Sequence, residues 1–151
     1  MIKGVQGALG DLDIDDHVVA VGQFEPRGMT GSLFAGGMIG DEIGGSVGGA
    51  IGMLGGMAES KHASGLPLHM LVGASASTVY GFAMPKSGRR GEPHQLLFRI
   101  PRDRLKAAVH ARVNVRILEL IDEQSGSRVE LEGSRLPLTH SHDLIEYLAG
   151  Q

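Results

Sequence analysis

Alternating hydrophobic and polar residues dominate the second half of the chain and predict β-strands. In residues 112–121, aliphatic side chains take every second position between Arg, Asn and Glu side chains, as they do on a strand with one buried face. The same period-2 pattern predicts seven strands, which cover 17–24, 69–73, 77–84, 95–100, 105–110, 112–121 and 128–132. The pattern slips at Ile117-Leu118, which predicts either a bulge or a strand that is buried on both faces.

The alternation also predicts which side chains share a face. In 17–24 it places Val19 and Val21 on one face and Val18 and Ala20 on the other. Pro26-Arg27-Gly28 carries turn-forming residues and is expected to end this strand. In 95–100 the alternation points three side chains inward: Leu96, Phe98 and Ile100.

The two ends of the chain differ in their patterns. Residues 1–16 show little periodicity and are expected to form an irregular lead-in. At the other end, Leu144, Ile145 and Leu148 recur at helical spacing. We expect a short helix there, capped by Ser141 and stopped at Gly150.

Residues 31–57 carry a third pattern, a glycine at every fourth position. The register is unbroken over Gly36, Gly40, Gly44, Gly48, Gly52 and Gly56. An aliphatic ridge keeps the same period one position earlier, at Ile39, Ile43, Val47 and Ile51. Residues four apart share one face of a helix, and small residues on that face let two helix backbones approach closely.

This pattern predicts a glycine-zipper helix over 30–60, about 45 Å long at 1.5 Å per residue. Two shorter helices, broken near Gly44-Gly45 or Gly48-Gly49, are the alternative. Each glycine costs a helix about 1 kcal/mol relative to alanine, so the stability of this segment has to come from packing. We therefore expect these ten glycine and aliphatic residues to drive self-association, or docking into a larger assembly.

Seven short strands followed by one helix, without βαβ alternation, predict a single α+β domain of mainly antiparallel β structure over 1–151. This order of elements resembles the pleckstrin-homology-like superfold, which includes the GRAM domain and bacterial relatives. The resemblance covers 17–24 and 69–148 and lies in element order. It implies a seven-stranded barrel or sandwich capped by the C-terminal helix, with the glycine-rich helix or helical hairpin inserted between the first and second strands.

The glycine stretch separately resembles the glycine-zipper segments of some bacterial membrane-associated proteins. Relatives of the pleckstrin-homology-like type commonly bind phosphate through basic residues that flank the first hairpin loop. Here the insertion occupies that loop and only Arg27 and Lys61 flank it. A separate basic turn at Lys86, Arg89 and Arg90 is the candidate contact for anionic lipid.

Charge is segregated along the chain although the net charge is only -3. Eight acidic residues fall within 1–60, whereas nine basic residues fall within 85–116. Such polarity can orient a chain on a membrane or steer a partner; alternatively, the basic residues lie on solvated strand faces and pair with the acidic half. The basic region contains one aromatic residue, Phe98, so stacking platforms for nucleic acid are missing and no nucleic-acid partner is expected.

Catalytic and cofactor motifs are sparse. The chain has no cysteine, which excludes disulfides and thiolate metal sites and favours a reducing, cytoplasmic location. No Gly-rich GKS or GKT occurs, and G-x-G-x-x-G is missing from 30–60. Ser75 lies in a sequence one glycine short of a nucleophile elbow and is expected to be a turn serine. We expect His140-Ser141-His142-Asp143 to cap a helix rather than hold a metal ion.

Two further features bear on membranes. The N-terminal segment does not have the pattern of a signal peptide. Asp41 and Glu42 would each oppose insertion of the glycine helix by about 2.5–3.5 kcal/mol at the bilayer centre. The same two residues are not expected to form a paired-carboxylate site, because adjacent side chains on a helix point in different directions.

Three functions remain open at this point. The first is a non-enzymatic interaction protein that self-assembles through the glycine zipper. The second is a membrane-associated module whose helices insert as an oligomer and whose basic face meets anionic lipid. The third is an enzyme that uses Ser75 or the 140–143 cluster. The sequence favours the first, with no catalytic residue, no cofactor and no metal.

Overall fold

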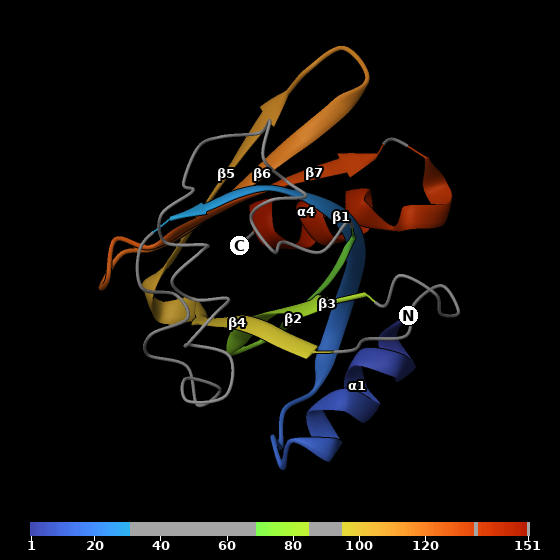
Figure 1. The fold of residues 1–151 in the computed structure, drawn as a ribbon, viewed down its shortest axis with the longest axis vertical. Coiled ribbons are helices and arrows are strands. Elements are labelled where there is room, and N and C mark those ends of the chain that lie inside the picture. Colours follow the sequence, from blue (N-terminus) through green and yellow to red (C-terminus); the bar gives the residue numbers. More distant parts are fainter. Residues whose placement is uncertain (31–68, 85–94, 135, 151) are drawn as a thin grey trace.

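The computed structural model describes residues 1–30, 69–84, 95–134 and 136–150 (Figure 1). Its main elements are α1 (Ile2–Asp11), β1 (Val18–Thr30), β2 (Met70–Ser75), β3 (Thr78–Ala83), β4 (Gln95–Pro101), β5 (Leu105–Ala111), β6 (Val115–Asp122), β7 (Arg128–Ser134) and α4 (Ser141–Ala149). The six glycines of the zipper register, their aliphatic ridge, and Lys86, Arg89 and Arg90 lie outside the described residues. The predictions made for them stay predictions.

The seven strands form one antiparallel sheet in the order β4-β3-β2-β1-β7-β6-β5. β1 is the strand that both halves share. Its first half pairs with β2, ending at Phe24 opposite Met70, and its second half pairs with β7 from Glu25 onward. The prediction of an α+β fold with seven antiparallel strands and a C-terminal helix is confirmed.

Two hydrophobic cores form on opposite faces of the first half of the sheet. The larger core lies between the two halves of the sheet and receives Leu144, Ile145 and Leu148 from α4. The smaller core lies under α1, which contributes Val5 and Leu9. Figure 1 shows α4 (red) between the two halves of the sheet and α1 (blue) outside the β2–β3 half.

The N-terminal segment is a helix, so the prediction of an irregular lead-in is wrong. Val5 and Leu9 are four residues apart and fully buried. Glycines at positions 4, 7 and 10 weaken the local helical preference, so α1 depends on packing against β1 and β2. No helix among the described residues is long and apolar enough to cross a membrane.

β1 does not end at Pro26 as predicted. It continues to Thr30 through a register shift between Pro26 and Gly28, just after β1 leaves β2 and joins β7. Proline lacks a backbone N–H and is tolerated in a strand at such a bulge. Arg27 lies within the shift and pairs with Glu132 at 2.8 Å.

A second bulge, at the start of β1, places the side chains on different faces from those predicted. The register shifts between Val18 and Ala20, so Val18 and Val21 both enter the smaller core while Ala20 enters the larger one. Val19 enters neither core and is 45% exposed. The predicted pairing of Val19 with Val21 on one face is therefore wrong.

A third register shift, between Gly81 and Phe82 on β3, affects β4. Phe98 and Ile100 lie in the larger core as predicted, but Leu96 lies in the smaller core on the opposite face. On β6, by contrast, Ile117 and Leu118 are both buried within a continuous register. Of the two alternatives predicted there, the strand buried on both faces is correct.

Two ends differ from prediction by a few residues. β6 begins at Val115 because residues 112–114 form the turn after β5. α4 has His140 as its N-cap, with φ 51°, and Ser141 is its first helical residue. The Ser141 hydroxyl donates instead to the Ser134 carbonyl oxygen of β7 at 2.7 Å. Gly150 ends the helix as predicted.

Candidate functional site

The 140–143 cluster borders a hollow of about 470 Å³ at the start of α4. Arg116 of β6 and Ser134 of β7 form one side. The chain between β7 and α4, which includes a 3₁₀ turn at Pro137–Thr139, forms the other. His140 to Asp143 stand together in the sequence, but no sequence pattern associates Arg116 with them, because Arg116 is 26 residues away from His142.

Two glycines let the start of α4 approach the sheet. A Cβ on Gly22 would lie 2.9 Å from the Ser141 Cα, and a Cβ on Gly133 would lie 3.0 Å from the Ser141 Cβ. Both distances are shorter than ordinary van der Waals contact, so a side chain at either position would push α4 outward. The Ser141 hydroxyl donates to Ser134 O at 2.7 Å and the Thr139 hydroxyl donates to Leu136 O at 2.8 Å, and these two bonds hold the turn in place.

His142 lies between a guanidinium and a carboxylate. Its Nδ1 is 2.6 Å from Arg116 Nη1 and its Nε2 is 3.0 Å from Glu146 Oε1. Arginine can only donate hydrogen bonds, so Nδ1 accepts and the Nε2–H donates to Glu146. His140 makes a separate pair with Asp143 at 2.9 Å.

These pairings separate the two histidines chemically. Each imidazole is bound to a different carboxylate, and in the described ranges no group of three His, Asp or Glu side chains is placed to hold a metal ion. The arrangement stabilises the α4 start and leaves a polar hollow beside it. It does not form a nucleophile–base pair.

Ser75, the other candidate nucleophile, is a buried structural hydroxyl at the end of β2. Its Oγ accepts the backbone N–H groups of Ser77 and Thr78 at 3.1 and 2.9 Å and donates to Asp16 Oδ2 at 2.5 Å. The Asp16 oxygen also receives the hydroxyls of Ser77 at 2.9 Å and Tyr80 at 2.8 Å. The prediction of a turn serine agrees with these contacts, because no histidine is among its hydrogen-bond partners in the described chain.

The hydrogen bonds alter the acidity of this group of side chains. Partial burial alone would raise the pKa of Asp16, but the hydroxyls of Ser75, Tyr80 and Ser77 and the His17 N–H together lower it below its ordinary value. Burial, with the hydrogen bond to Asp16, raises the pKa of Tyr80 to about 12. Asp16 precedes its partners by 59 to 64 residues, so no local motif could reveal the cluster.

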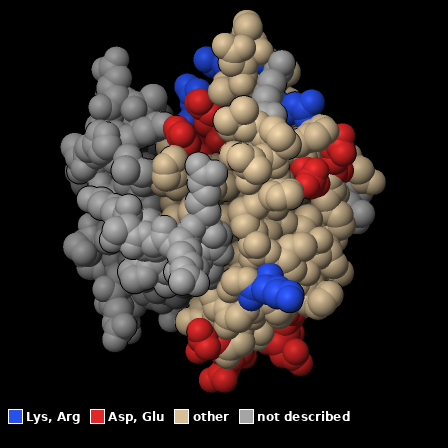
Figure 2. Space-filling view, turned by 90° about the vertical axis from the view of Figure 1, so that its right-hand side faces the viewer, with Lys and Arg blue, Asp and Glu red and all other residues tan. Residues whose placement is uncertain are grey.

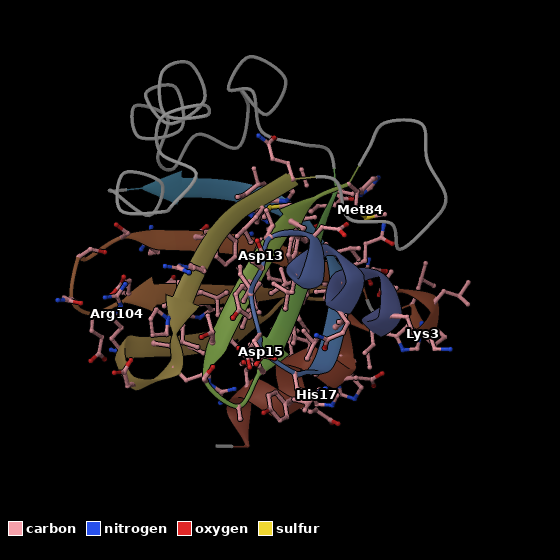
Figure 3. The ribbon with its side chains drawn as sticks, turned by 90° about the horizontal axis from the view of Figure 1, so that it is seen from below. Lys3, Asp13, Asp15, His17, Met84 and Arg104 are labelled. Carbon is pink, nitrogen blue, oxygen red and sulfur yellow. The ribbon has the colours of Figure 1, made fainter. Side chains whose placement is uncertain are left out.

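Charge pairing occurs mainly within the second half of the sheet. Arg104 pairs with Asp122 at 3.2 Å, and Arg128 contacts Glu119 and Glu130 at 3.8 and 3.2 Å. Acidic Asp13 and Asp15 lie beyond the C-terminal end of α1, far along that helix from Lys3 (Figure 3). Of the two arginines, Arg104 belongs to the basic region 85–116, and its acidic partner Asp122 lies at the end of β6.

No protein-family model matches the chain, and none of the curated proteins matches it.

Proposed function

We propose that the chain is a non-enzymatic interaction protein in which the α+β core serves as a platform and a glycine-zipper helix over 30–60 joins copies of the chain. The observation that carries the proposal is the unbroken register from Gly36 to Gly56 with its aliphatic ridge. A glycine groove beside such a ridge is suited to close helix packing and poorly suited to an isolated helix.

The attachment of this segment supports the proposal. β1 ends at Thr30, six residues beyond Phe24, and β2 begins at Met70 opposite Phe24. Six strand residues span about 20 Å, a gap that fewer than ten extended residues can bridge. Most of residues 31–68 is therefore not needed to connect the two strands.

The fold resemblance belongs to the same proposal. Two antiparallel meanders, β1–β4 and β5–β7, are joined by pairing of β1 with β7, and the C-terminal helix packs on the larger core. This arrangement supports a pleckstrin-homology-like platform. In that arrangement the zipper replaces the first hairpin loop, where relatives commonly keep a ligand site. The proposed ligand of this loop is a second copy of the chain.

A register-matched pair of double variants tests the proposal. Gly44→Leu with Gly48→Leu fills the groove and is expected to reduce the oligomer to a monomer, as measured by light scattering after gel filtration. Gly45→Leu with Gly49→Leu makes the same chemical change one position off the register and is expected to retain more of the oligomer. A wild-type monomer, or an equal effect of both pairs, would contradict the proposal.

Membrane association is the second candidate function. The observation that favours it is a group of exposed aliphatic side chains on two turns: Val113, Leu136 and Leu138 are 86%, 67% and 71% exposed. The β5–β6 hairpin protrudes at the top of Figure 1, on the same side as the chain between β7 and α4. Single exposed aliphatic residues are common, but exposed apolar groups that lie together mark sites of protein or membrane interaction.

Vesicle flotation distinguishes this function from the first. Binding to phosphatidylserine vesicles that is lost on Lys86→Glu, Arg89→Glu and Arg90→Glu would favour the basic turn as the lipid contact. Binding lost on Val113→Asp and Leu138→Asp would favour the two turns. Absence of flotation with the wild type, together with full release on carbonate extraction, excludes this function.

A further inference from the structure

A groove crosses β1 between the start of α1 and the first two turns of α4. Its volume is about 660 Å³, compared with about 470 Å³ for the hollow beside the 140–143 cluster. Ile2 and Lys3 of α1 form one wall, residues 19–21 of β1 form the floor, and Tyr147 with the His140–Asp143 pair forms the opposite wall. The face that contains the start of α1 and α4 is turned toward the viewer in Figure 2, where uncharged surface (tan) covers most of it.

The bulge in β1 supplies the floor of the groove. In a regular strand Val19 would point to the same face as Val21, which is buried under α1. The register shift between Val18 and Ala20 removes Val19 from that face and places it in the groove. Val19 and Ile2 are each 45% exposed there, although both could gain about 25 cal/mol for every Å² of apolar surface removed from water.

The α4 wall is positioned by contacts of Tyr147, His140 and Asp143. The Tyr147 hydroxyl donates to the Ser75 carbonyl oxygen at 3.4 Å, and the Arg102 guanidinium lies 5.2 Å from the ring centroid. His140 and Asp143 are paired with each other at 2.9 Å. The contacts of Tyr147 outside the groove orient its ring before an occupant enters, which lowers the cost of binding.

The size of the groove favours a small molecule over a protein. Nine residues line it, whereas a stable protein–protein interface uses roughly 20–30 residues from each partner. Its volume lies within the range of about 300–1,000 Å³ that is usual for small-molecule sites. Such sites combine apolar walls with a few polar groups that orient the ligand.

The charges favour an anionic head group. Lys3 makes no ion pair within the described part of the chain, and it borders the groove on the α1 wall. The carboxylate on the opposite wall, Asp143, is already engaged by His140. From this arrangement we infer that the groove binds a small aliphatic anion, with its carboxylate or phosphate against Lys3 and its hydrocarbon chain over Ile2, Val19 and Tyr147. The inference does not depend on the glycine segment.

Calorimetry with dodecanoate, used below its micelle-forming concentration, tests the inference on the full-length protein. The wild type is expected to bind one dodecanoate per chain. Val19→Glu and Ile2→Glu, which change exposed positions on different elements, should each weaken binding at least tenfold. Leu12→Glu is the matched control, because Leu12 is a similarly exposed aliphatic residue (43%) that does not line the groove. This variant should leave dodecanoate binding unchanged.

Lys3→Glu tests the head group separately. It should weaken dodecanoate binding and strengthen binding of dodecyltrimethylammonium, which has the same chain and the opposite charge. Absence of saturable binding, or equal losses in Val19→Glu and Leu12→Glu, would overturn the inference. A change in native mass caused by Val19→Glu would also overturn it, because the groove would then be a protein interface.

Discussion

Asp16 connects the N-terminal segment to the sheet at the level of single residues. Its carboxylate receives hydroxyls from Ser75, Ser77 and Tyr80, and its backbone carbonyl receives the Gln6 side-chain amide at 2.6 Å. The Gln6 amide oxygen in turn accepts the Val18 N–H at 3.0 Å. Asp16 and Gln6 together thus join α1, the start of β1 and the β2–β3 turn.

Replacement of Asp16 by alanine removes the acceptor from all three hydroxyls. We expect the free energy of unfolding at pH 7 to fall by about 1–3 kcal/mol, the usual cost when buried hydrogen-bonding groups lose their partner. Asp15→Ala is the control, because an exposed neighbouring carboxylate should change stability by less than about 0.5 kcal/mol. Urea titration followed by circular dichroism measures both.

The lowered pKa of Asp16 sets the pH dependence of this contribution. A carboxyl group whose pKa is depressed on folding stabilises the protein above its unfolded-state pKa, and the stabilisation is lost as pH falls through the folded value. The stability difference between wild type and Asp16→Ala should therefore be largest above about pH 5 and shrink progressively below about pH 4. A difference that stays constant from pH 7 to pH 2.5 would contradict this assignment.

Tyr80 gives the opposite pH window. Its pKa is raised to about 12 in the folded chain, whereas in an unfolded chain it titrates near 10. The neutral phenol is thus favoured on folding, and the associated stability is complete below pH 10 and lost between pH 10 and 12. In Tyr80→Phe the decline of stability across that window should be shallower than in wild type.

At the scale of elements, the strands were predictable and the bulges were not. β4, β5 and β7 begin at the predicted residues, and on β7 buried and half-buried positions alternate as expected for a strand with one buried face. The bulges at Val19 and opposite Phe82 depend on pairing with a strand distant in sequence, which the local pattern does not contain. Val113 shows the converse error: it continues the alternation of 112–121 but lies exposed in a turn.

The two sites follow the same rule. His140 to Asp143 could be found from sequence because they are adjacent, whereas their partner Arg116 is brought to them by β6–β7 pairing. The groove between α1 and α4 could not be predicted from sequence, because its floor depends on the bulge in β1 and one of its walls is α1, which the sequence pattern did not reveal as a helix. Three glycines within α1 obscured its helical pattern, since only Val5 and Leu9 mark its buried face.

Two glycine-to-alanine substitutions test these elements in opposite directions. A Cβ on Gly81 of β3 would overlap the buried ring of Phe98, and overpacking of this kind should cost about 1–3 kcal/mol. A Cβ on Gly7 of α1 meets nothing within 4 Å, so Gly7→Ala should stabilise the protein by about 0.5–1 kcal/mol through helix propensity. Equal effects in thermal unfolding would contradict the placement of both residues.

At the scale of the whole molecule, the cores are built by residues that lie on both sides of the glycine segment. The larger core joins Ala20 and Phe24 of β1 to Met70 and Val72 of β2, and the smaller joins Val18 and Val21 to Leu71. Because the gap from Thr30 to Met70 is about 20 Å, a Gly/Ser linker of about ten residues can replace residues 31–68 without stretching either strand.

The shortened chain is therefore expected to keep its β-rich circular dichroism spectrum and one cooperative thermal transition, while its native mass falls to that of a monomer. A folded chain that remains oligomeric would place self-association on the sheet or its turns instead of the glycine segment. Loss of cooperative unfolding would mean that residues 31–68 stabilise the cores, and the division of the chain into platform and zipper would be wrong. The full-length double variant Gly45→Leu with Gly49→Leu is measured in parallel. If its native mass also falls to that of a monomer, any change within residues 31–68 disrupts the oligomer, and the effect is not specific to the zipper register.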